Sequence, residues 1–185
     1  SHVVPTLGEE TAEKMAREVS EVREAKDSVG GVISCRVYGL PAGLGEPLYD
    51  KLTSRLASAM LGINAARGFE LGEGFALASM RGSVANDPFH LNAEGRVAQV
   101  TNRGGGTLGG ITTGAPLTFR VAFKPTSSIG LPQETVRRDL EAVRLEITGR
   151  HDPCLALRAV PVVEAMTALT LMDFYLLHAR STQRQ

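Results

Sequence analysis

The stretch TGRHDPC, residues 148–154, places an arginine, a histidine and an aspartate in a row before a proline. Arg150 can bind an anion, while His151 and Asp152 can accept or release a proton. Each residue alone has an ordinary structural interpretation: a surface ion pair, a loop histidine and a turn former. Their combination, just before a long apolar stretch, raises the question of which compound they act on.

A second stretch, KPTSS, carries groups that suit phosphate oxygens. It combines one positive charge, three hydroxyls and a stiff backbone, supplied by Lys124, Pro125, Thr126, Ser127 and Ser128. It is not a Walker loop, and a polar turn at the end of a strand explains the same residues. Taken alone, this stretch favours the turn.

Glycine is concentrated in TNRGGGTLGGITTG, residues 101–114, where it fills six of fourteen positions. Each glycine costs conformational entropy when the chain becomes ordered. More glycines than a turn requires therefore indicate that something approaches the backbone closely.

Periodicity predicts the elements that position these stretches. Apolar residues recurring every three or four positions predict amphipathic helices at 9–27, ended by Gly30 and Gly31, and at about 48–63. Alternation predicts strands at 32–38, 96–100, 117–124 and 143–148, with two more joined by a glycine turn within 66–80. Residues 83–95 are predicted to form a long loop.

The last predicted element is a central helix over 162–180, apolar on nearly every side, with Pro161 in its first turn. Glu164 inside such a helix would need a partner if buried, and Cys154 is expected to be packed. The first helix is expected to cover one side of a core.

Composition limits the class of protein. Apolar residues at 43% and charged residues at 22% are typical of a soluble globular chain, and 185 residues suggest one domain, 1–185. Twenty basic and twenty acidic residues remove the broad positive field that nucleic acid or anionic membranes attract. Two cysteines favour a reducing compartment, by default the cytoplasm. No secretory signal, apolar run of membrane-spanning length or metal site is predicted, and the start directly on a helix suggests a piece of a longer chain.

Several motifs together resemble one family. GRHDPCLALRAVPVVEAM, KPTSSI, GGGTLGGITTG, LPAGLGEPLYDKL and INAARGFELGEGF resemble the C-terminal half of the chorismate synthases, from about Asp27 to about Asp173. The resemblance implies an α+β fold in which helices lie between antiparallel β-sheets, and usually a homotetramer. It implies a lyase of the shikimate pathway that forms chorismate by anti 1,4-elimination of phosphate from 5-enolpyruvylshikimate 3-phosphate. The reaction needs reduced FMN, with NADPH as a possible reductant.

The resemblance also implies roles for particular residues. It places Asn64, Ala65, Gly109, Lys124 through Ser128 and Arg150 at the flavin, with Arg150 also at the substrate. Asp152 matches an aspartate that assists, near flavin N5, the proton leaving substrate C6.

The chain departs from the family pattern in what it lacks. The GESHG-type motif, the two catalytic histidines and the phosphate-binding arginine cluster of the N-terminal half have no counterpart here, so none of the four histidines is assigned a catalytic role. Within the matched region, Arg103, Gly104, Thr112 and Thr113 replace commoner residues. We expect part of a chorismate synthase that is inactive alone; the alternative is a stand-alone flavin-binding, phosphate-binding or assembly module without catalysis.

Overall fold

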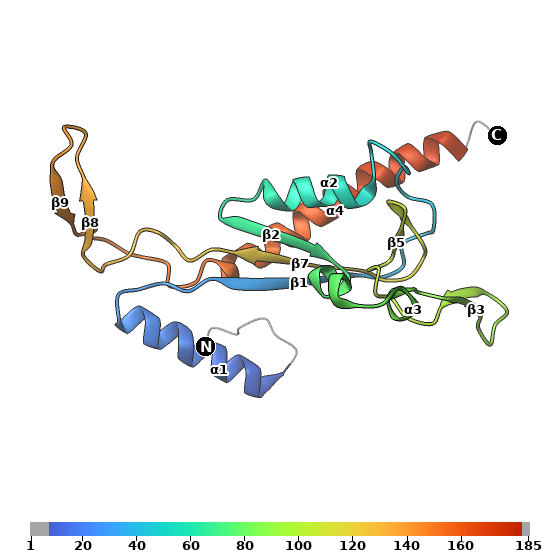
Figure 1. Ribbon diagram of the computed structural model, residues 1–185, viewed down its shortest axis with the longest axis horizontal. Coiled ribbons are helices and arrows are strands. Elements are labelled where there is room, and N and C mark those ends of the chain that lie inside the picture. Colours follow the sequence, from blue (N-terminus) through green and yellow to red (C-terminus); the bar gives the residue numbers. More distant parts are fainter. Residues whose placement is uncertain (1–7, 183–185) are drawn as a thin grey trace. The chain divides into compact units, whose positions relative to one another are not determined.

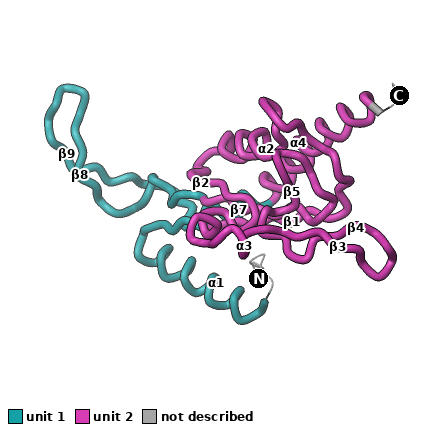
Figure 2. Tube along the Cα trace, turned by 45° about the vertical axis from the view of Figure 1, so that its right-hand side comes forward, with its two compact units in different colours: residues 1–31, 123–160 teal, residues 32–122, 161–185 magenta. Residues whose placement is uncertain are grey.

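The computed structural model describes residues 8–182, which group into two compact units (Figure 2). The first unit comprises Ser1–Gly31 and Phe123–Val160, and the second comprises Val32–Ala122 and Pro161–Gln185. The predicted site residues fall in both. Lys124 through Ser128, Arg150 and Asp152 belong to the first unit, whereas Asn64, Ala65 and Gly109 belong to the second.

The centre of the second unit is a three-stranded sheet in the order β1-β7-β2, formed by β1 (Gly31–Val37), β7 (Leu117–Phe123) and β2 (Ala66–Leu71). Alternate residues of β7 are buried, namely Leu117, Phe119, Val121 and Phe123. This alternation confirms the strand predicted at 117–124. It gives the sheet one apolar face and one face with polar side chains.

Helices α2 (Leu52–Leu61) and α4 (Ala156–Thr182) cover the sheet (Figure 1). α2 buries Leu52, Leu56 and Met60 completely, each burial contributing roughly 1.5–3 kcal/mol. The helix begins four residues later than predicted, and Leu48 is 60% exposed. The Leu52 N–H donates to the Gly110 carbonyl at 2.9 Å, which holds the start of the helix against the glycine-rich segment.

α4 differs from the prediction in where it begins and in how much of it is buried. It begins at Ala156, so Pro161 lies inside the helix, where it removes a backbone donor but keeps a helical φ. Only one side is buried, through Ala159, Val163, Thr167, Leu171 and Phe174. The helix is therefore not central within the described residues. Glu164 is exposed, so no buried carboxylate needs a partner there.

α4 is also long and apolar enough to cross a membrane by length and composition alone, with a hydropathy of 1.5 over Ala156–Ser181. The sequence analysis predicted no such run. The core helix of a soluble protein can have the same length and composition. α4 also contacts its own unit through Thr167, 4.0 Å from the Cys35 sulfur, and Asp173, 3.0 Å from Arg55. Length and composition of one such helix are therefore weak evidence for a membrane span.

Two antiparallel hairpins extend the second unit: β3 (Phe89–Leu91) with β4 (Val97–Gln99), and β5 (Thr107–Leu108) with β6 (Ile111–Thr112). β4 confirms the strand predicted at 96–100. The long loop predicted at 83–95 instead contains β3 and part of α3 (Gly82–Ala85). Asn92 Oδ1 accepts from the Glu94 and Arg96 N–H groups and closes the first hairpin.

Only the first of the two strands predicted within 66–80 is present. The second is a 3₁₀ helix, η1 (Gly74–Ser79). Glu70 accepts a hydrogen bond from the Phe75 N–H at 3.1 Å, and Gly74 lies against the Glu70 side chain with a φ of +53°. The contact of the Glu70 side chain with the Phe75 N–H thus favours a tight helical turn over the predicted second strand.

The first unit contains α1 (Glu9–Glu24) and the antiparallel hairpin of β8 (Gln133–Val136) and β9 (Ala142–Leu145). α1 ends before Lys26, which has a left-handed φ of 58°, rather than at the predicted glycine pair. It has no buried residue, so it does not cover a core within the described residues. β9 overlaps the strand predicted at 143–148, whereas β8 was not predicted.

Candidate functional site

Two of the predicted loops are joined in the first unit by residues 28–30. The Ser28 hydroxyl donates to the Thr126 carbonyl at 2.7 Å, and the Val29 N–H donates to the Pro153 carbonyl at 2.8 Å. The KPTSS stretch and the HDPC turn therefore flank one short segment. The structure brings together two parts of the predicted site that lie some 25 residues apart in the chain.

The glycine pair at the start of β1 makes this junction possible. A Cβ atom on Gly30 would lie 2.5 Å from the Phe123 carbonyl oxygen, and one on Gly31 would lie 2.7 Å from the Ala156 Cβ. Such distances are far below van der Waals contact, so only glycine fits. Sequence reasoning interpreted the pair as a helix end and missed its role as the junction between the loops.

Within the KPTSS stretch, Lys124 Nζ donates to Ser127 Oγ at 2.8 Å. Thr126 Oγ1 is buried and has no hydrogen-bond partner within residues 8–182. A buried hydroxyl without a partner costs about 1–3 kcal/mol. This stretch therefore keeps both a cation and an unsatisfied hydroxyl, which a plain polar turn does not require.

The HDPC turn places its carboxylate in a partly covered position. Asp152 Oδ2 accepts from the Arg158 guanidinium at 3.0 Å, and the side chain of Asp152 is 24% exposed against 77% for Arg158. His151 Nε2 lies 3.1 Å from the Ile147 carbonyl, so that nitrogen carries the proton in this contact. Arg150 is exposed.

The predicted site residues of the second unit lie at opposite ends of α2. Asn64 and Ala65 follow its C-terminal end, and Ala65 has a left-handed φ of 69°. Gly109 lies next to Gly110, whose carbonyl accepts from the first residue of the helix. Ten helical residues separate the two places by about 15 Å. They do not form one cluster within this unit.

The glycine-rich segment is packed against its own chain. Cβ atoms on Gly105 and Gly106 would lie 2.5 Å from the Gly72 nitrogen and from the Pro116 oxygen, and one on Gly110 would lie 2.5 Å from Lys51 Cγ. The close approach inferred from composition is therefore explained, at these positions, by other backbone and side-chain atoms of the unit. Gly109 is the exception, because an added Cβ would meet nothing within 4 Å.

Gly109 and Gly110 form the two-residue turn between β5 and β6. Their φ angles are +61° and +93°, the combination that a type I′ hairpin turn requires. The turn explains the left-handed backbone at Gly109, and its open surroundings leave room beside it.

Sequence reasoning missed Asp87, which holds the start of the glycine-rich segment. Its carboxylate accepts from Thr101 Oγ1 at 2.6 Å and from the N–H groups of Arg103 at 2.8 Å and Gly104 at 2.7 Å. Burial alone would raise the pKa of Asp87, but these hydrogen bonds and the Arg103 charge lower it. Only the NDP sequence, a common turn signal, could have indicated it.

Comparison with known proteins identifies the family. The family model described as chorismate synthase matches residues 1–176, which is most of the chain. The chain belongs to the chorismate synthase family. This confirms the resemblance carried by the five motifs.

Relatives named chorismate synthase are similar over nearly the whole chain. One from Porphyromonas gingivalis is 54% identical over 85% of this chain and 43% of its own length. One from Opitutus terrae is 53% identical over 90% of this chain and 46% of its length. A relative from Solanum lycopersicum, named chorismate synthase 1, chloroplastic, is 49% identical over 94% of this chain and 39% of its length. The chain thus spans less than half the length of these curated relatives.

A crystal structure of chorismate synthase has the same fold. It aligns with a TM-score of 0.73 and 31% identity over 91% of this chain and 44% of the other. The predicted class, α+β with helices and antiparallel sheets, is confirmed.

The donor set of the first unit fits an anionic group such as a phosphate. It offers the Lys124 ammonium, the unsatisfied Thr126 hydroxyl and the exposed Arg150 guanidinium. For a metal ion, no group of three or more histidine, cysteine or carboxylate side chains exists among the described residues. Cys35 and Cys154 are free thiols, and Cys154 is buried as expected.

Proposed function

We propose that this chain is the C-terminal part of a chorismate synthase, which eliminates phosphate from 5-enolpyruvylshikimate 3-phosphate to give chorismate. The observation that carries the proposal is the junction at residues 28–30. In a chain of this family, it keeps the phosphate-binding stretch and the Arg150–Asp152 turn beside each other. An elimination of phosphate needs both anion binding and proton handling at one place.

Reduced FMN is the proposed cofactor. Residues 124–128 and Arg150 of the first unit are proposed to bind it, and the family resemblance alone assigns Asn64, Ala65 and Gly109 of the second unit to the same cofactor. Lys124 and the hydroxyls of Thr126, Ser127 and Ser128 bind its phosphate. Gly109 has open space beside its backbone and lets the ring system approach. When bound, the reduced flavin supplies the electron density that starts cleavage of the carbon–oxygen bond.

Asp152 is the proposed proton-handling residue. Its Oδ2 is held by Arg158, so Oδ1 is the oxygen that assists the proton leaving substrate C6. Arg150, two residues earlier, neutralises substrate charge. The positive charge of Arg150 also compensates the charge of the departing phosphate.

We propose further that the 185-residue chain does not catalyse turnover alone. The relatives are more than twice as long as the matched part, and the family's N-terminal histidine and arginine motifs are not in this sequence. α4 exposes large apolar side chains, including Leu169, Met172, Tyr175 and Leu176. Apolar surface of this kind is typical of a contact with more protein. A homotetramer, reduction by NADPH and a cytoplasmic location are proposals that rest on the family alone.

An anaerobic titration with reduced FMN tests the function. A complete chorismate synthase that contains this sequence is expected to bind FMN and form chorismate, whereas its Lys124→Ala variant should bind FMN about tenfold more weakly, the loss of one charge-assisted contact. Lys14→Ala is the matched control, because Lys14 forms only an exposed helical pair with Glu10.

The 185-residue chain, its intact mass confirmed, decides between the two hypotheses. Two results together would support the stand-alone binding module: the absorbance of FMN changes when the 185-residue chain is added, and a complete protein that contains the chain forms no chorismate. The proposal is supported if the complete protein forms chorismate and the 185-residue chain does not.

A further inference from the structure

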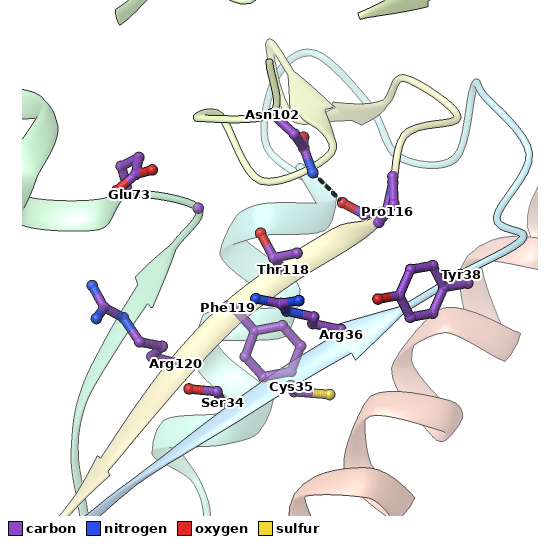
Figure 3. Close-up of a pocket in the computed structure, with 11 residues that line it drawn as sticks. Ser34, Cys35, Arg36, Tyr38, Glu73, Asn102, Pro116, Thr118, Phe119 and Arg120 are labelled. Carbon is purple, nitrogen blue, oxygen red and sulfur yellow. Dashed lines mark hydrogen bonds between the residues drawn. The ribbon is translucent and has the colours of Figure 1, made fainter. Parts of the chain in front are cut away.

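A cavity of about 510 Å³ lies in the second unit on the polar face of the three-stranded sheet (Figure 3). Its floor comes from β1 and β7, and its rim comes from the turn after β2 and the segments before and after the β5–β6 hairpin. The volume falls within the range of small-molecule sites. None of the residues predicted at the flavin lines it.

Cationic groups gather on the floor of the cavity. Arg36 projects from β1 and Arg120 from β7 (Figure 3). Arg120 is paired with Glu70 at 2.7 Å, whereas Arg36 has no ion-pair or hydrogen-bond partner within residues 8–182. Arg36 therefore offers a planar guanidinium that is free to bind a carboxylate through two hydrogen bonds.

Hydrogen-bond acceptors gather at the rim, where Asn102 is held in a fixed orientation. Its Nδ2 donates to the Pro116 carbonyl at 2.7 Å, which leaves Oδ1 as the other end of the amide. Oδ1 is buried and has no donor among the described residues. Asp87 fixes both neighbours of Asn102, through Thr101 and Arg103. Asn102 is thus held rigidly at the rim, while its amide oxygen has almost no surface open to the cavity.

The Glu73 carboxylate also lines the rim. In Figure 3 Glu73 and Asn102 lie above the guanidinium groups of Arg120 and Arg36. The Glu73 carboxylate would repel a simple anion, and Arg36 would repel a simple cation. A ligand with a negative group at one end and an ammonium group at the other satisfies both sides.

We propose that this cavity binds a zwitterionic α-amino acid. The ligand carboxylate pairs with Arg36, and its ammonium group faces the Glu73 carboxylate. The Tyr38 ring, 68% exposed, and Pro116 are available to contact the side chain of the amino acid. The site is independent of the proposed catalytic function, because it uses none of the same residues.

Calorimetric titration with L-leucine, N-acetyl-L-leucine and L-leucinamide tests the proposal. L-leucine is expected to bind saturably, while the acetylated compound, which lacks the ammonium group, and the amide, which lacks the carboxylate, each bind at least about tenfold more weakly. Arg36→Gln should weaken L-leucine binding by a similar factor without changing the thermal unfolding midpoint. Arg81→Gln, an exposed arginine outside the cavity, should leave binding unchanged.

Three results would overturn the proposal: no binding of L-leucine at tens of millimolar, equal binding of all three compounds, or wild-type affinity in Arg36→Gln. FMN titration of Arg36→Gln separates this site from the proposed catalytic site. Unchanged FMN affinity with lost leucine binding supports two separate sites, whereas parallel loss of both would contradict their independence.

Discussion

Unusual residues gather in the glycine-rich segment of the second unit and in the two polar loops of the first unit, but for different reasons. In the glycine-rich segment the unusual residues are used internally, because Gly105, Gly106 and Gly110 each lie against other atoms of the unit. In the polar loops they are not fully used, because Thr126 Oγ1 is buried and has no partner in the part of the chain that the structure describes. Groups that the fold leaves unsatisfied are better indicators of a ligand than unusual composition.

The comparison also explains why Gly109 and Gly110 differ although they are neighbours. Gly110 is confined by Lys51 and the Glu46 carbonyl, while Gly109 opens onto free space. Both have positive φ angles because they form one hairpin turn. Only Gly109 combines a backbone that requires glycine with room for another molecule.

Gly105→Ala should have the largest effect on stability. The added Cβ would lie 2.5 Å from the Gly72 nitrogen and 2.7 Å from the Thr118 oxygen, and the φ of +69° disfavours any side chain. Overpacking together with the left-handed backbone should lower the free energy of unfolding by about 3 kcal/mol or more. Gly109→Ala is the matched control and should cost about 1 kcal/mol, because only the backbone term applies. Urea denaturation measures both, and equal losses would remove the distinction between packed and open glycines.

Asp87→Ala should have the next largest effect, because it leaves the Arg103 and Gly104 N–H groups without their acceptor. We expect a loss of about 2 kcal/mol in the free energy of unfolding at pH 7. The folded-state pKa of Asp87 is lowered, so its contribution is present above the unfolded pKa of about 3.9 and is lost as pH falls through the folded pKa. The difference between wild type and variant should therefore shrink in acid. A constant difference from pH 7 down to pH 3 would contradict the role of the charge, and the exposed Glu94→Ala serves as control.

Thr126→Val should affect binding rather than stability. Valine keeps the shape of threonine and removes the hydroxyl that has no partner, so the free energy of unfolding should stay unchanged or rise slightly. FMN affinity in a complete enzyme containing this sequence should fall about tenfold, the effect of one lost hydrogen bond. Thr53→Val, a partly exposed helical threonine in the other unit, is the control. A large loss of stability with unchanged FMN affinity would mean that the hydroxyl serves the fold.

Arg158→Gln should have the smallest effect. The pair with Asp152 joins a 77% exposed guanidinium to a mostly covered carboxylate, so solvent screens much of the attraction. We expect a change of about 0.5 kcal/mol in the free energy of unfolding, measured by thermal denaturation. A change several times larger would show that the pair fixes the HDPC turn.

The sequence predicted those elements that are set by local patterns. Burial on one face produces a periodic apolar pattern in the sequence. This pattern is visible in the alternation of 117–124 and in the helical repeat of Leu52, Leu56 and Met60. The 3₁₀ helix after β2 depends on the contact of Glu70 with Phe75 N–H, and α4 tolerates Pro161 in its interior; neither has a periodic signal.

The candidate site was predictable in its residues and not in its geometry. KPTSS and GRHDPC could be recognised as motifs, but their junction through Ser28 and Val29 depends on contacts between distant segments. Asp87 was missed for the same reason, because its partners lie 14 to 17 residues away. Single residues whose role comes from long-range hydrogen bonds carry no local signature.

The most direct test of the central claim is the steady-state rate of chorismate formation by Asp152→Asn in a complete chorismate synthase that contains this sequence, measured with reduced FMN under anaerobic conditions. If this carboxylate handles the substrate proton, turnover should fall by about 10²- to 10⁴-fold while FMN affinity changes little. A wild-type rate in this variant would contradict the account and remove Asp152 from the mechanism.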